Sequence, residues 1–180
     1  MRIISGTLGG RIIKPPAKMP YTRPTTDVAK TGLFNILENH FGLSDKKTLD
    51  LFGGTGSISF ELASRGATDL TIVEKDHQMS AFIKSTAGIL NIDIRLFKMD
   101  VFKFIKQCSE KYDFIFAGPP YALTEIDQIP ELIFEYQLLN LNGWLILEHT
   151  PRNTYKNHPY YKNERHYGTT VFSIFINTAV

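Results

Sequence analysis

The sequence has 180 residues, of which 43% are hydrophobic and 21% charged, and this is the length of one domain or of one domain with a short appendage. Such a composition excludes a disordered or fibrous chain. No apolar run approaches the roughly 18 residues of a membrane-spanning helix, and the N-terminal segment lacks the apolar core of a signal peptide. The single cysteine, Cys108, excludes an internal disulfide and a cysteine-based zinc site, so we expect a cytoplasmic protein.

The formal net charge of +2 conceals an uneven distribution of charge along the chain. Residues 1–30 carry six basic side chains and one acidic one, residues 31–150 carry ten basic and sixteen acidic ones, and residues 151–168 carry four basic and one acidic. Basic ends around an acidic middle indicate a polyanion held by appendages. Chance clustering on a solvated surface explains the same pattern equally well.

The first thirty residues predict an arm that precedes the main domain. Arg2–Ser5 and Arg11–Lys14 are short β-rich runs separated by glycines, which indicates a β-hairpin. Several prolines then exclude regular structure until Thr25 or Thr26 can cap a helix that runs through Leu37. We therefore expect a basic β-hairpin arm over 1–24 and a second domain over 25–180.

From about residue 48, short apolar runs alternate with stretches of helical pattern. The expected strands, buried on both faces, are Thr48–Phe52, Leu70–Val73, Ile92–Phe97, Phe114–Ala117 and Trp144–Leu147. The expected helices are Ser57–Arg65, His77–Leu90, Val101–Ser109 and Glu125–Leu139. This alternation predicts an α/β fold with a mostly parallel sheet and helices on both faces. Tyr160–Tyr167 and Thr170–Ile176, separated by Gly168, add an antiparallel C-terminal hairpin, which makes a seven-stranded sheet similar to the Rossmann-like methyltransferase layout.

A glycine-rich turn follows the first expected strand, in the segment LDLFGGTGSISFE at 49–61. Such a turn before a helix lets a ligand approach the backbone closely. Glu74 and Asp100 end the next two strands, where they are placed to bind a ribose and an adenine amine, although either could simply cap a helix. Because Ser59 replaces the third glycine of G-x-G-x-x-G, we expect a nucleoside without phosphates, and S-adenosylmethionine fits. The expected cofactor-binding residues are Asp50, Phe52, Gly53, Gly54, Gly56, Glu74, Lys75, Asp100, Val101 and Ala117.

The fourth strand ends in YDFIFAGPPYAL, residues 112–123. Two consecutive prolines lock φ and remove two N–H donors, so that nearby carbonyls stay free to accept hydrogen bonds. Tyr121 supplies an aromatic face on which a base can stack. The alternative is a plain proline turn with a core tyrosine. At the fourth strand of this layout we favour a catalytic segment made of Gly118, Pro119, Pro120 and Tyr121.

Several blocks of the chain, in order, resemble the RsmD family of 16S ribosomal RNA methyltransferases. The blocks are RIISGTLGGR at 2–11, RPTTD at 23–27, LFNIL at 33–37, LDLFGGTGSISFELASRGA at 49–67, PPY at 119–121 and LNGWLILEH at 141–149. The resemblance implies methyl transfer from S-adenosylmethionine to the exocyclic N2 amine of a guanine, with 16S ribosomal RNA or the small ribosomal subunit as partner. It also implies that rRNA contacts come from Arg2, Arg11, Lys14, Arg23 and Thr25.

The chain departs from the pattern of this family in two places. In the helix after RPTTD, Val28 and Thr31 replace an arginine and a glutamate usual in the family. The second place is the motif after the fourth strand, which in the family is Asp-Pro-Pro-Tyr or Asp-Pro-Pro-Phe. Gly118 stands where the family has the aspartate that orients the target amine. Asp113 cannot replace it, because five residues of extended strand span about 16 Å. The loss of one such contact typically costs about 10²–10³ in rate, so the sequence predicts an impaired methyltransferase.

Two alternatives to this interpretation of the chain, and one to that of the arm, stay open. An amino-methyltransferase acting on adenine in DNA or RNA would use a related motif, and a non-catalytic RNA-binding or assembly protein could keep the fold. The basic arm could be a structural flap. We expect a monomer, no membrane partner and no metal, because His149, His158 and His166 lack metal-ligand spacing and are interpreted as surface residues.

Overall fold

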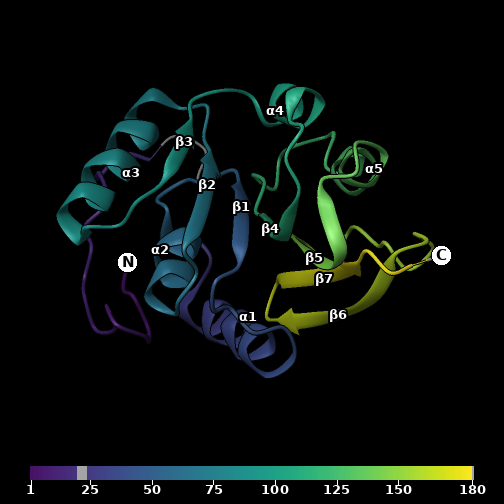
Figure 1. The fold of residues 1–180 in the computed structure, drawn as a ribbon, viewed down its shortest axis with the longest axis horizontal. Helices are drawn as coiled ribbons and strands as arrows, with labels where there is room; N and C mark the ends of the chain where they lie inside the picture. Colours follow the sequence, from purple (N-terminus) through teal and green to yellow (C-terminus); the bar gives the residue numbers. More distant parts are fainter. Residues whose placement is uncertain (20–23, 180) are drawn as a thin grey trace.

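A computed structural model describes residues 1–19 and 24–179 of the chain, which form a seven-stranded sheet with five helices around it (Figure 1). In chain order the elements are α1 (Asp27–His40), β1 (Lys47–Leu51), α2 (Ser57–Ser64), β2 (Asp69–Val73), α3 (His77–Leu90), β3 (Arg95–Phe97), α4 (Val101–Gln107), β4 (Tyr112–Ala117), α5 (Gln128–Glu135), β5 (Leu139–His149), β6 (Tyr161–Tyr167) and β7 (Thr170–Ile176).

The sheet has the order β3-β2-β1-β4-β5-β7-β6. The first five strands of this order are joined by parallel pairings, whereas β7 runs antiparallel to both β5 and β6. The predicted mostly parallel sheet with an antiparallel C-terminal hairpin is therefore confirmed. From β1 the chain adds β2 and β3 on one side and then β4 and β5 on the other, so the strand order reverses between β1 and β4. In open α/β sheets, ligands bind at the carboxyl ends of the strands at such a reversal.

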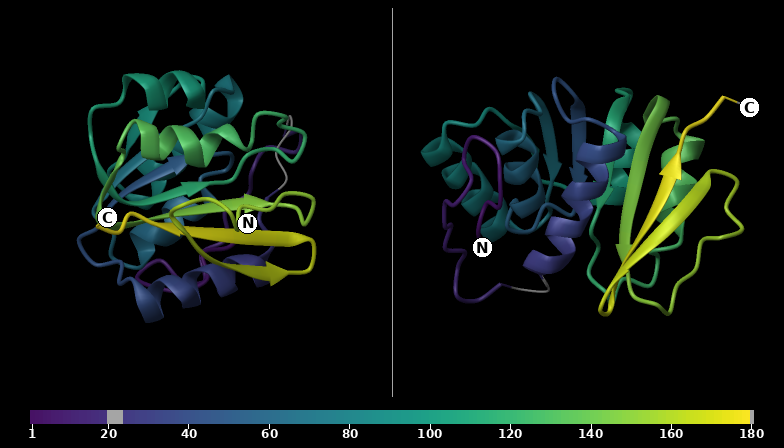
Figure 2. Two further views of the ribbon diagram at one scale, coloured as in Figure 1. Left: turned by 90° about the vertical axis from the view of Figure 1, so that its right-hand side faces the viewer. Right: turned by 90° about the horizontal axis from the view of Figure 1, so that it is seen from below.

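Helices cover both faces of the sheet, as the alternating pattern predicts (Figure 2). One cluster of buried side chains, which includes Ile105 of α4 and Ile129 of α5, packs against Ile115 of β4. On the opposite face, Leu33 of α1 packs in a second cluster with Phe114 of β4. Alternate residues of β4 thus enter different cores, because successive side chains of a strand point to opposite faces.

Two predicted elements are shorter than their apolar runs. The strand expected over 92–97 forms pairs only at Arg95–Phe97, and none of its three residues is buried, so the expectation of burial on both faces is wrong for β3. The reason is its position at the sheet edge, where one side has no partner strand. The helix expected over 125–139 spans Gln128–Glu135, and Gln137, with φ +53°, turns the chain back toward β5.

The expected N-terminal hairpin is not formed as a two-stranded ladder among the described residues. Residues 2 and 12 form one isolated antiparallel bridge, in which the N–H group of Ile3 bonds the carbonyl of Arg11 at 3.0 Å and that of Ile13 bonds the carbonyl of Met1 at 2.8 Å. The N–H groups of Ile4 and Ser5 bond the two carboxylate oxygens of Glu61, and the N–H group of Thr7 bonds the carbonyl of Ser64. The two halves of the arm therefore pair over a short stretch around this bridge, and further N–H groups of the arm bond α2.

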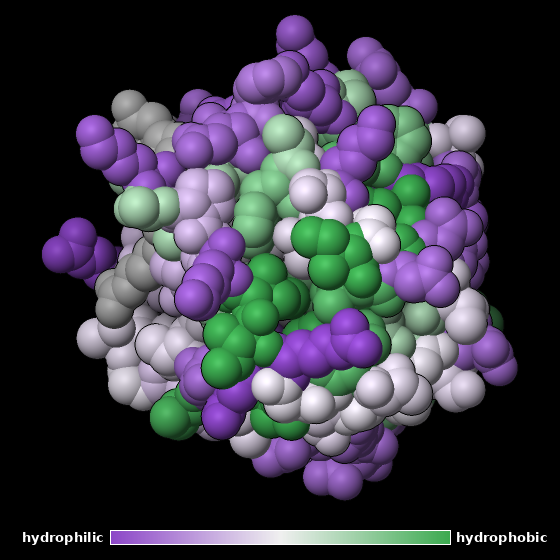
Figure 3. Space-filling view, turned by 90° about the vertical axis from the view of Figure 1, so that its left-hand side faces the viewer, coloured by the Kyte–Doolittle hydropathy of each residue, from purple (hydrophilic) through white to green (hydrophobic). Residues whose placement is uncertain are grey.

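The arm lies beside α2 and α3, at the end of the molecule that carries the N-terminus (Figure 1). Ile3 and Ile13 are buried there with Phe60, Ile72 and Ile83. From this side, apolar side chains reach the surface in the middle of the face, and charged and polar side chains surround them (Figure 3). Among the helices of residues 1–19 and 24–179, none is long and apolar enough to cross a membrane.

Candidate functional site

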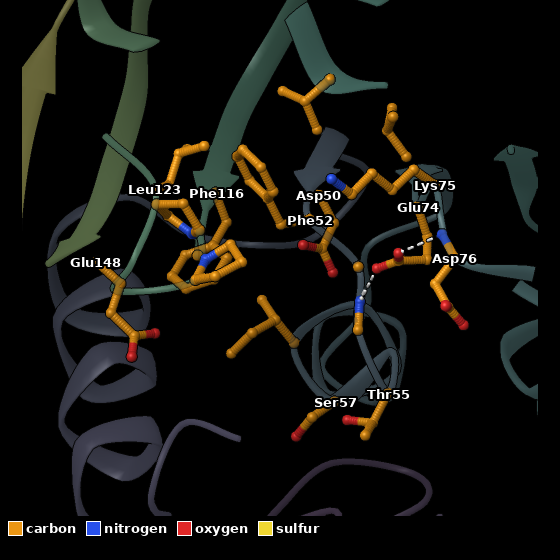
Figure 4. Close-up of a pocket in the computed structure, with 18 of the residues that line it drawn as sticks. Asp50, Phe52, Thr55, Ser57, Glu74, Lys75, Asp76, Phe116, Leu123 and Glu148 are labelled. Carbon is orange, nitrogen blue, oxygen red and sulfur yellow. Dashed lines mark hydrogen bonds between the residues drawn. The ribbon is translucent and has the colours of Figure 1, made fainter. Parts of the chain in front are cut away.

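A cavity of about 650 Å³ lies at the carboxyl ends of β1, β2 and β4, where the strand order reverses (Figure 4). Its size is that of an ordinary small-molecule site. The residues that line it are Pro24, Thr25, Asp50, Phe52, Gly53, Gly54, Thr55, Ser57, Ile58, Val73, Glu74, Lys75, Asp76, His77, Asp100, Val101, Phe102, Phe116, Gly118, Pro119, Pro120, Tyr121, Leu123 and Glu148.

The turn between β1 and α2 forms the floor of this cavity. Phe52, Gly54 and Gly56 have φ values of +65°, +57° and +77°, so the chain passes through the left-handed region three times in five residues. This region is strained for a phenylalanine, and such strain is concentrated at functional sites. Gly53 lies too close to β2 for any side chain, because a Cβ atom there would lie 2.4 Å from Cγ2 of Ile72.

Glu74 follows β2 and joins the turn to the loop before α3. Its Oε2 accepts a hydrogen bond of 2.7 Å from the N–H group of Gly54, and its Oε1 accepts one of 2.8 Å from that of Asp76 (Figure 4). The alternative interpretation, a helix N-cap, is wrong for Glu74 because Asp76 caps α3. A carboxylate has about four lone-pair sites, so these two bonds are compatible with acceptance of ligand hydroxyls.

Asp50 is buried at the end of β1 and has one side-chain hydrogen-bond donor, Oγ of Ser59, at 2.8 Å. Burial raises the pKa of Asp50 to about 7, although the hydrogen bond from Ser59 opposes this rise. The negative charge of Glu74 raises the pKa further. A cation in the cavity would reverse these effects by favouring the ionised form.

Asp100 caps a helix and also lies in the lining of the cavity. Its Oδ1 caps α4 by accepting the N–H group of Lys103 at 3.1 Å, as the capping alternative requires. The same residue also lines the cavity beside Val101 and Phe102, where a planar apolar group could lie against their side chains.

The segment after β4 forms the opposite wall. The N–H group of Gly118 bonds the carbonyl of Leu51 at 3.4 Å, and the carbonyl of Pro120 accepts the N–H group of Leu123 at 2.9 Å in a turn. The carbonyl of Pro120 is therefore already engaged in the turn. Tyr121 is partly buried, and its hydroxyl lies 3.2 Å from Oε1 of Glu148.

Glu148 was not predicted from the sequence. It lies near the end of β5 and is only 5% exposed, and its Oε2 accepts a hydrogen bond of 2.6 Å from Oγ1 of Thr25. Figure 4 shows it at the other end of the cavity from Glu74. The available signal was a carboxylate directly after the apolar run Leu145–Leu147, at the same sheet edge as the predicted acids.

The cavity brings together most of the predicted residues. Those that line it are Asp50, Phe52, Gly53, Gly54, Glu74, Lys75, Asp100, Val101, Gly118, Pro119, Pro120, Tyr121 and Thr25. Two predicted cofactor residues do not line it. Ala117 is fully buried in the core. Gly56 precedes α2, and a Cβ atom at this position would lie 2.6 Å from Cε2 of the Phe60 ring.

The residues predicted to contact RNA are distributed around the arm. Arg11 and Lys14 are exposed, and Arg2 is exposed with its guanidinium 3.7 Å from Asp27. Arg23 lies outside the described residues.

The histidines give no sign of a metal centre. His149 is fully buried, so its interpretation as a surface residue is wrong, and its ring lies 2.7 Å from both the carbonyl of Thr150 and Oγ of Ser173. Burial lowers the pKa of His149, which favours a neutral ring. Among the described residues, no group of three His, Cys, Asp or Glu side chains could hold a metal ion.

The charge of the lining agrees with the predicted cofactor. Among residues 1–19 and 24–179, five carboxylates line the cavity, from Asp50, Glu74, Asp76, Asp100 and Glu148, against one lysine or arginine side chain, that of Lys75. Such a lining disfavours phosphates and favours a cationic nucleoside. S-adenosylmethionine, with its sulfonium, fits these residues.

Comparisons with known proteins agree with this geometry. Residues 1–176 match the family described as Conserved hypothetical protein 95. Over 146 residues the chain is 32% identical to ribosomal RNA small subunit methyltransferase D of Escherichia coli strain K12, which covers 81% of the chain and 69% of that protein. The solved structure of yhhF from E. coli, described as a putative methyltransferase, superposes with a TM-score of 0.85 at 25% identity and covers 100% of this chain and 99% of that one.

A more distant structure shares the fold. The 16S rRNA N2 G1207 methyltransferase RsmC of Thermus thermophilus, solved with AdoMet and guanosine, superposes with a TM-score of 0.69 at 17% identity. The superposition covers 87% of this chain and 44% of that one.

Proposed function

Because the chain belongs to the RsmD family of S-adenosylmethionine-dependent methyltransferases, we propose that it methylates the exocyclic N2 amine of a guanine in small-subunit ribosomal RNA. One observation carries this proposal. The glycine turn after β1, the acids after β2 and β3, and the Pro-Pro-Tyr segment after β4 line a single cavity. The acids that would bind the cofactor and the Tyr121 ring on which a base could stack thus line the same cavity.

The cofactor side is formed by the first three strand ends. Glu74 accepts hydrogen bonds from the ribose hydroxyls, and Asp100 accepts one from the adenine amine. Asp50 lies at the methionine end of the cofactor. When bound, S-adenosylmethionine supplies a methyl group, which leaves with its C–S bond electrons remaining on sulfur as the amine lone pair forms the new N–C bond. No metal is needed for this transfer.

The target side is formed by the segment after β4. A guanine turned out of its stack lies against Tyr121, whose hydroxyl is held between Glu148 at 3.2 Å and Oγ1 of Thr170 at 3.3 Å. These contacts fix the plane of the ring. Fixed orientation is important because the amine lone pair of guanine is delocalised into the base, so its reaction depends on alignment with the methyl group.

The arm over 1–24 holds the RNA backbone outside the cavity. Arg11 and Lys14 are exposed and suit phosphate contacts, with Arg2 and Arg23 beside them in the sequence. The arm is also a structural cover for α2, since the N–H groups of Ile4 and Ser5 are bonded to Glu61. The basic arm and the flap interpretations are therefore compatible.

The test is methyl transfer to small ribosomal subunits and to naked 16S RNA that lack the modification, followed by digestion to nucleosides. N2-methylguanosine is the expected product. N6-methyladenosine would instead identify an adenine amino-methyltransferase. S-adenosylhomocysteine binding in calorimetry without transfer to any RNA would identify a non-catalytic RNA-binding protein.

Glu74→Ala is the matched control for cofactor binding. It removes the acceptor proposed for the ribose, together with the bonds from the N–H groups of Gly54 and Asp76, and does not alter the residues after β4. We expect both cofactor affinity and methyl transfer to fall. Unchanged cofactor affinity in this variant would contradict the proposed site.

A further inference from the structure

The target end of the cavity has a carboxylate although the motif aspartate is missing. A Cβ atom at residue 118 would lie 3.7 Å from Oε2 of Glu148. Glu148 thus places its carboxylate beside the space into which an aspartate at 118 would project. Glu74 and Asp50 lie elsewhere in the cavity, on the cofactor side (Figure 4).

The position of Glu148 is defined by three elements. Its backbone lies in β5, next to Leu147, which pairs with Ala117 at the end of β4. Oγ1 of Thr25, which precedes α1, donates to Oε2 at 2.6 Å, and the Tyr121 hydroxyl donates to Oε1 at 3.2 Å. A side chain that is almost fully buried and held from two sides has little freedom to leave the cavity.

We propose that Glu148 is a catalytic residue that accepts the hydrogen bond of the target amine in place of the missing motif aspartate. This inference rests on the proposed function. Thr25 and Tyr121 donate to different oxygens of the carboxylate, and one carboxylate oxygen can accept more than one hydrogen bond. The longer side chain of glutamate, reaching from the neighbouring strand, replaces the shorter one that residue 118 lacks.

The carboxylate acts in two ways during the transfer. Before reaction, its negative charge accepts one N–H of the amine and directs the nitrogen lone pair toward the methyl group. When the lone pair has formed the N–C bond and the C–S bond pair has remained on sulfur, the nitrogen is positively charged. It then releases one proton to Glu148, which passes the proton to water, and the base is left neutral with one methyl group.

The first test is Glu148→Gln, which keeps size and removes the charge. We expect kcat to fall about 10²–10³-fold, the effect typical of one lost transition-state hydrogen bond. Affinity for S-adenosylhomocysteine, measured by calorimetry, is expected to stay within twofold. The affinity for a guanine-containing RNA fragment in the presence of S-adenosylhomocysteine is expected to fall, which gives a readout independent of turnover.

Thr25→Val is the matched control, because it removes a hydroxyl bonded to Glu148 and keeps the carboxylate. If Glu148 only anchors the segment before α1, the two variants will lose activity equally. We expect Thr25→Val to lose less than tenfold. Equal losses, or Glu148→Gln activity within threefold of the wild type, would overturn the assignment.

Restoring the aspartate provides a rescue test. Gly118→Asp in the Glu148→Gln background is expected to recover at least tenfold in kcat. Gly118→Ala controls for crowding, because a Cβ at 118 would lie 2.9 Å from Cε1 of Phe116 and the ring must shift. Thermal melts of each variant exclude loss of fold, and a stable double variant without recovery would count against the assignment.

The two proposals fail in distinguishable ways. A wild-type protein whose activity toward guanine is unchanged in Glu148→Gln would overturn the role of Glu148 and leave the proposed function standing. If neither protein methylates guanine in any small-subunit RNA, both proposals are wrong.

Discussion

Glu61 of α2 anchors the N-terminal arm, and its charge can be removed without a change in volume by Glu61→Gln. Its buried carboxylate accepts the N–H groups of Ile4 and Ser5 at 2.8 and 3.0 Å. It also pairs with Lys30 at 3.1 Å and Arg65 at 2.9 Å, whose side chains are 2% and 5% exposed. In the variant, the buried Lys30 loses its paired anion, whereas Arg65 keeps its ion pair with Glu38 at 2.8 Å.

Breaking a buried ion pair by removing one partner typically costs about 3–5 kcal/mol, because the remaining charge stays buried without compensation. We expect a loss in this range in the free energy of unfolding, measured by urea denaturation at pH 7. Amide hydrogen exchange at Ile4 and Ser5 should accelerate as well. A loss below about 1 kcal/mol, or unchanged exchange at these amides, would refute the reasoning.

The effect of Glu61 depends on pH with a definite sign. Burial alone raises the pKa of Glu61, but the bonds from Ile4, Ser5, Lys30 and Arg65 outweigh it and hold the pKa below its usual range. A depressed carboxyl pKa contributes stability that is complete above the ordinary value of 4.5 and is lost as pH falls through the folded value. The stabilities of wild type and Glu61→Gln should therefore converge in acid.

Glu110 provides a matched control on the surface. Its carboxylate also pairs with two cations, Lys47 and Arg95, but its side chain is 41% exposed. Exposed pairs typically contribute less than about 1 kcal/mol, since water screens the charges. Glu110→Gln should thus cost much less than Glu61→Gln, and equal losses would show that burial is not the deciding factor.

Three further predictions concern the cavity and the arm. Because burial raises the pKa of Asp50 to about 7, the stability of the ligand-free protein falls as pH rises from about 4 to 7, so Asp50→Asn should raise the melting temperature at pH 8 and not at pH 4. The same variant should weaken S-adenosylmethionine binding in calorimetry at pH 8. Gly53→Ala places a Cβ atom 2.4 Å from Cγ2 of Ile72, so we expect the free energy of unfolding, measured by urea denaturation, to fall by about 1–3 kcal/mol. The affinity for the cofactor should fall as well. Arg11→Ala and Lys14→Ala should each reduce the slope of log K against log salt by about 0.7 in filter binding to single-stranded rRNA fragments, and an unchanged slope would exclude phosphate contacts by these residues.

Most of the fold follows from local patterns in the sequence. The apolar runs and helical stretches predict the order of elements, and α3 has the predicted bounds of His77–Leu90 because Asp76 caps its start and Asn91, with φ +55°, ends it. The first five apolar runs are separated by helices, which predicts parallel strands, and the last two runs have no helix between them, which predicts an antiparallel hairpin. The short β3 does not follow, because its pairing depends on its place at the sheet edge.

The arm shows where local patterns are insufficient. Residues 2–14 have the composition of a β-hairpin and pair around one bridge, but the N–H groups of Ile4 and Ser5 bond Glu61, more than fifty residues further along the chain. Lys30 meets the same carboxylate from α1. Neither contact can be read from sequence spacing, since both depend on the packing of α1 and α2 against one face of the sheet.

The fold class, the family and the acids at the first three strand ends can be predicted from the amino-acid sequence, because they depend on periodicity and on motifs within single segments. The absence of a carboxylate at residue 118 is visible there too. The folded chain is needed to find that Glu148, thirty residues later in β5, lies beside that position, with Oε2 3.7 Å from where a Cβ at 118 would stand. The physical reason is that parallel pairing of β4 with β5 brings both carboxyl ends to one edge, and side-chain contacts across strands have no signature in either strand alone.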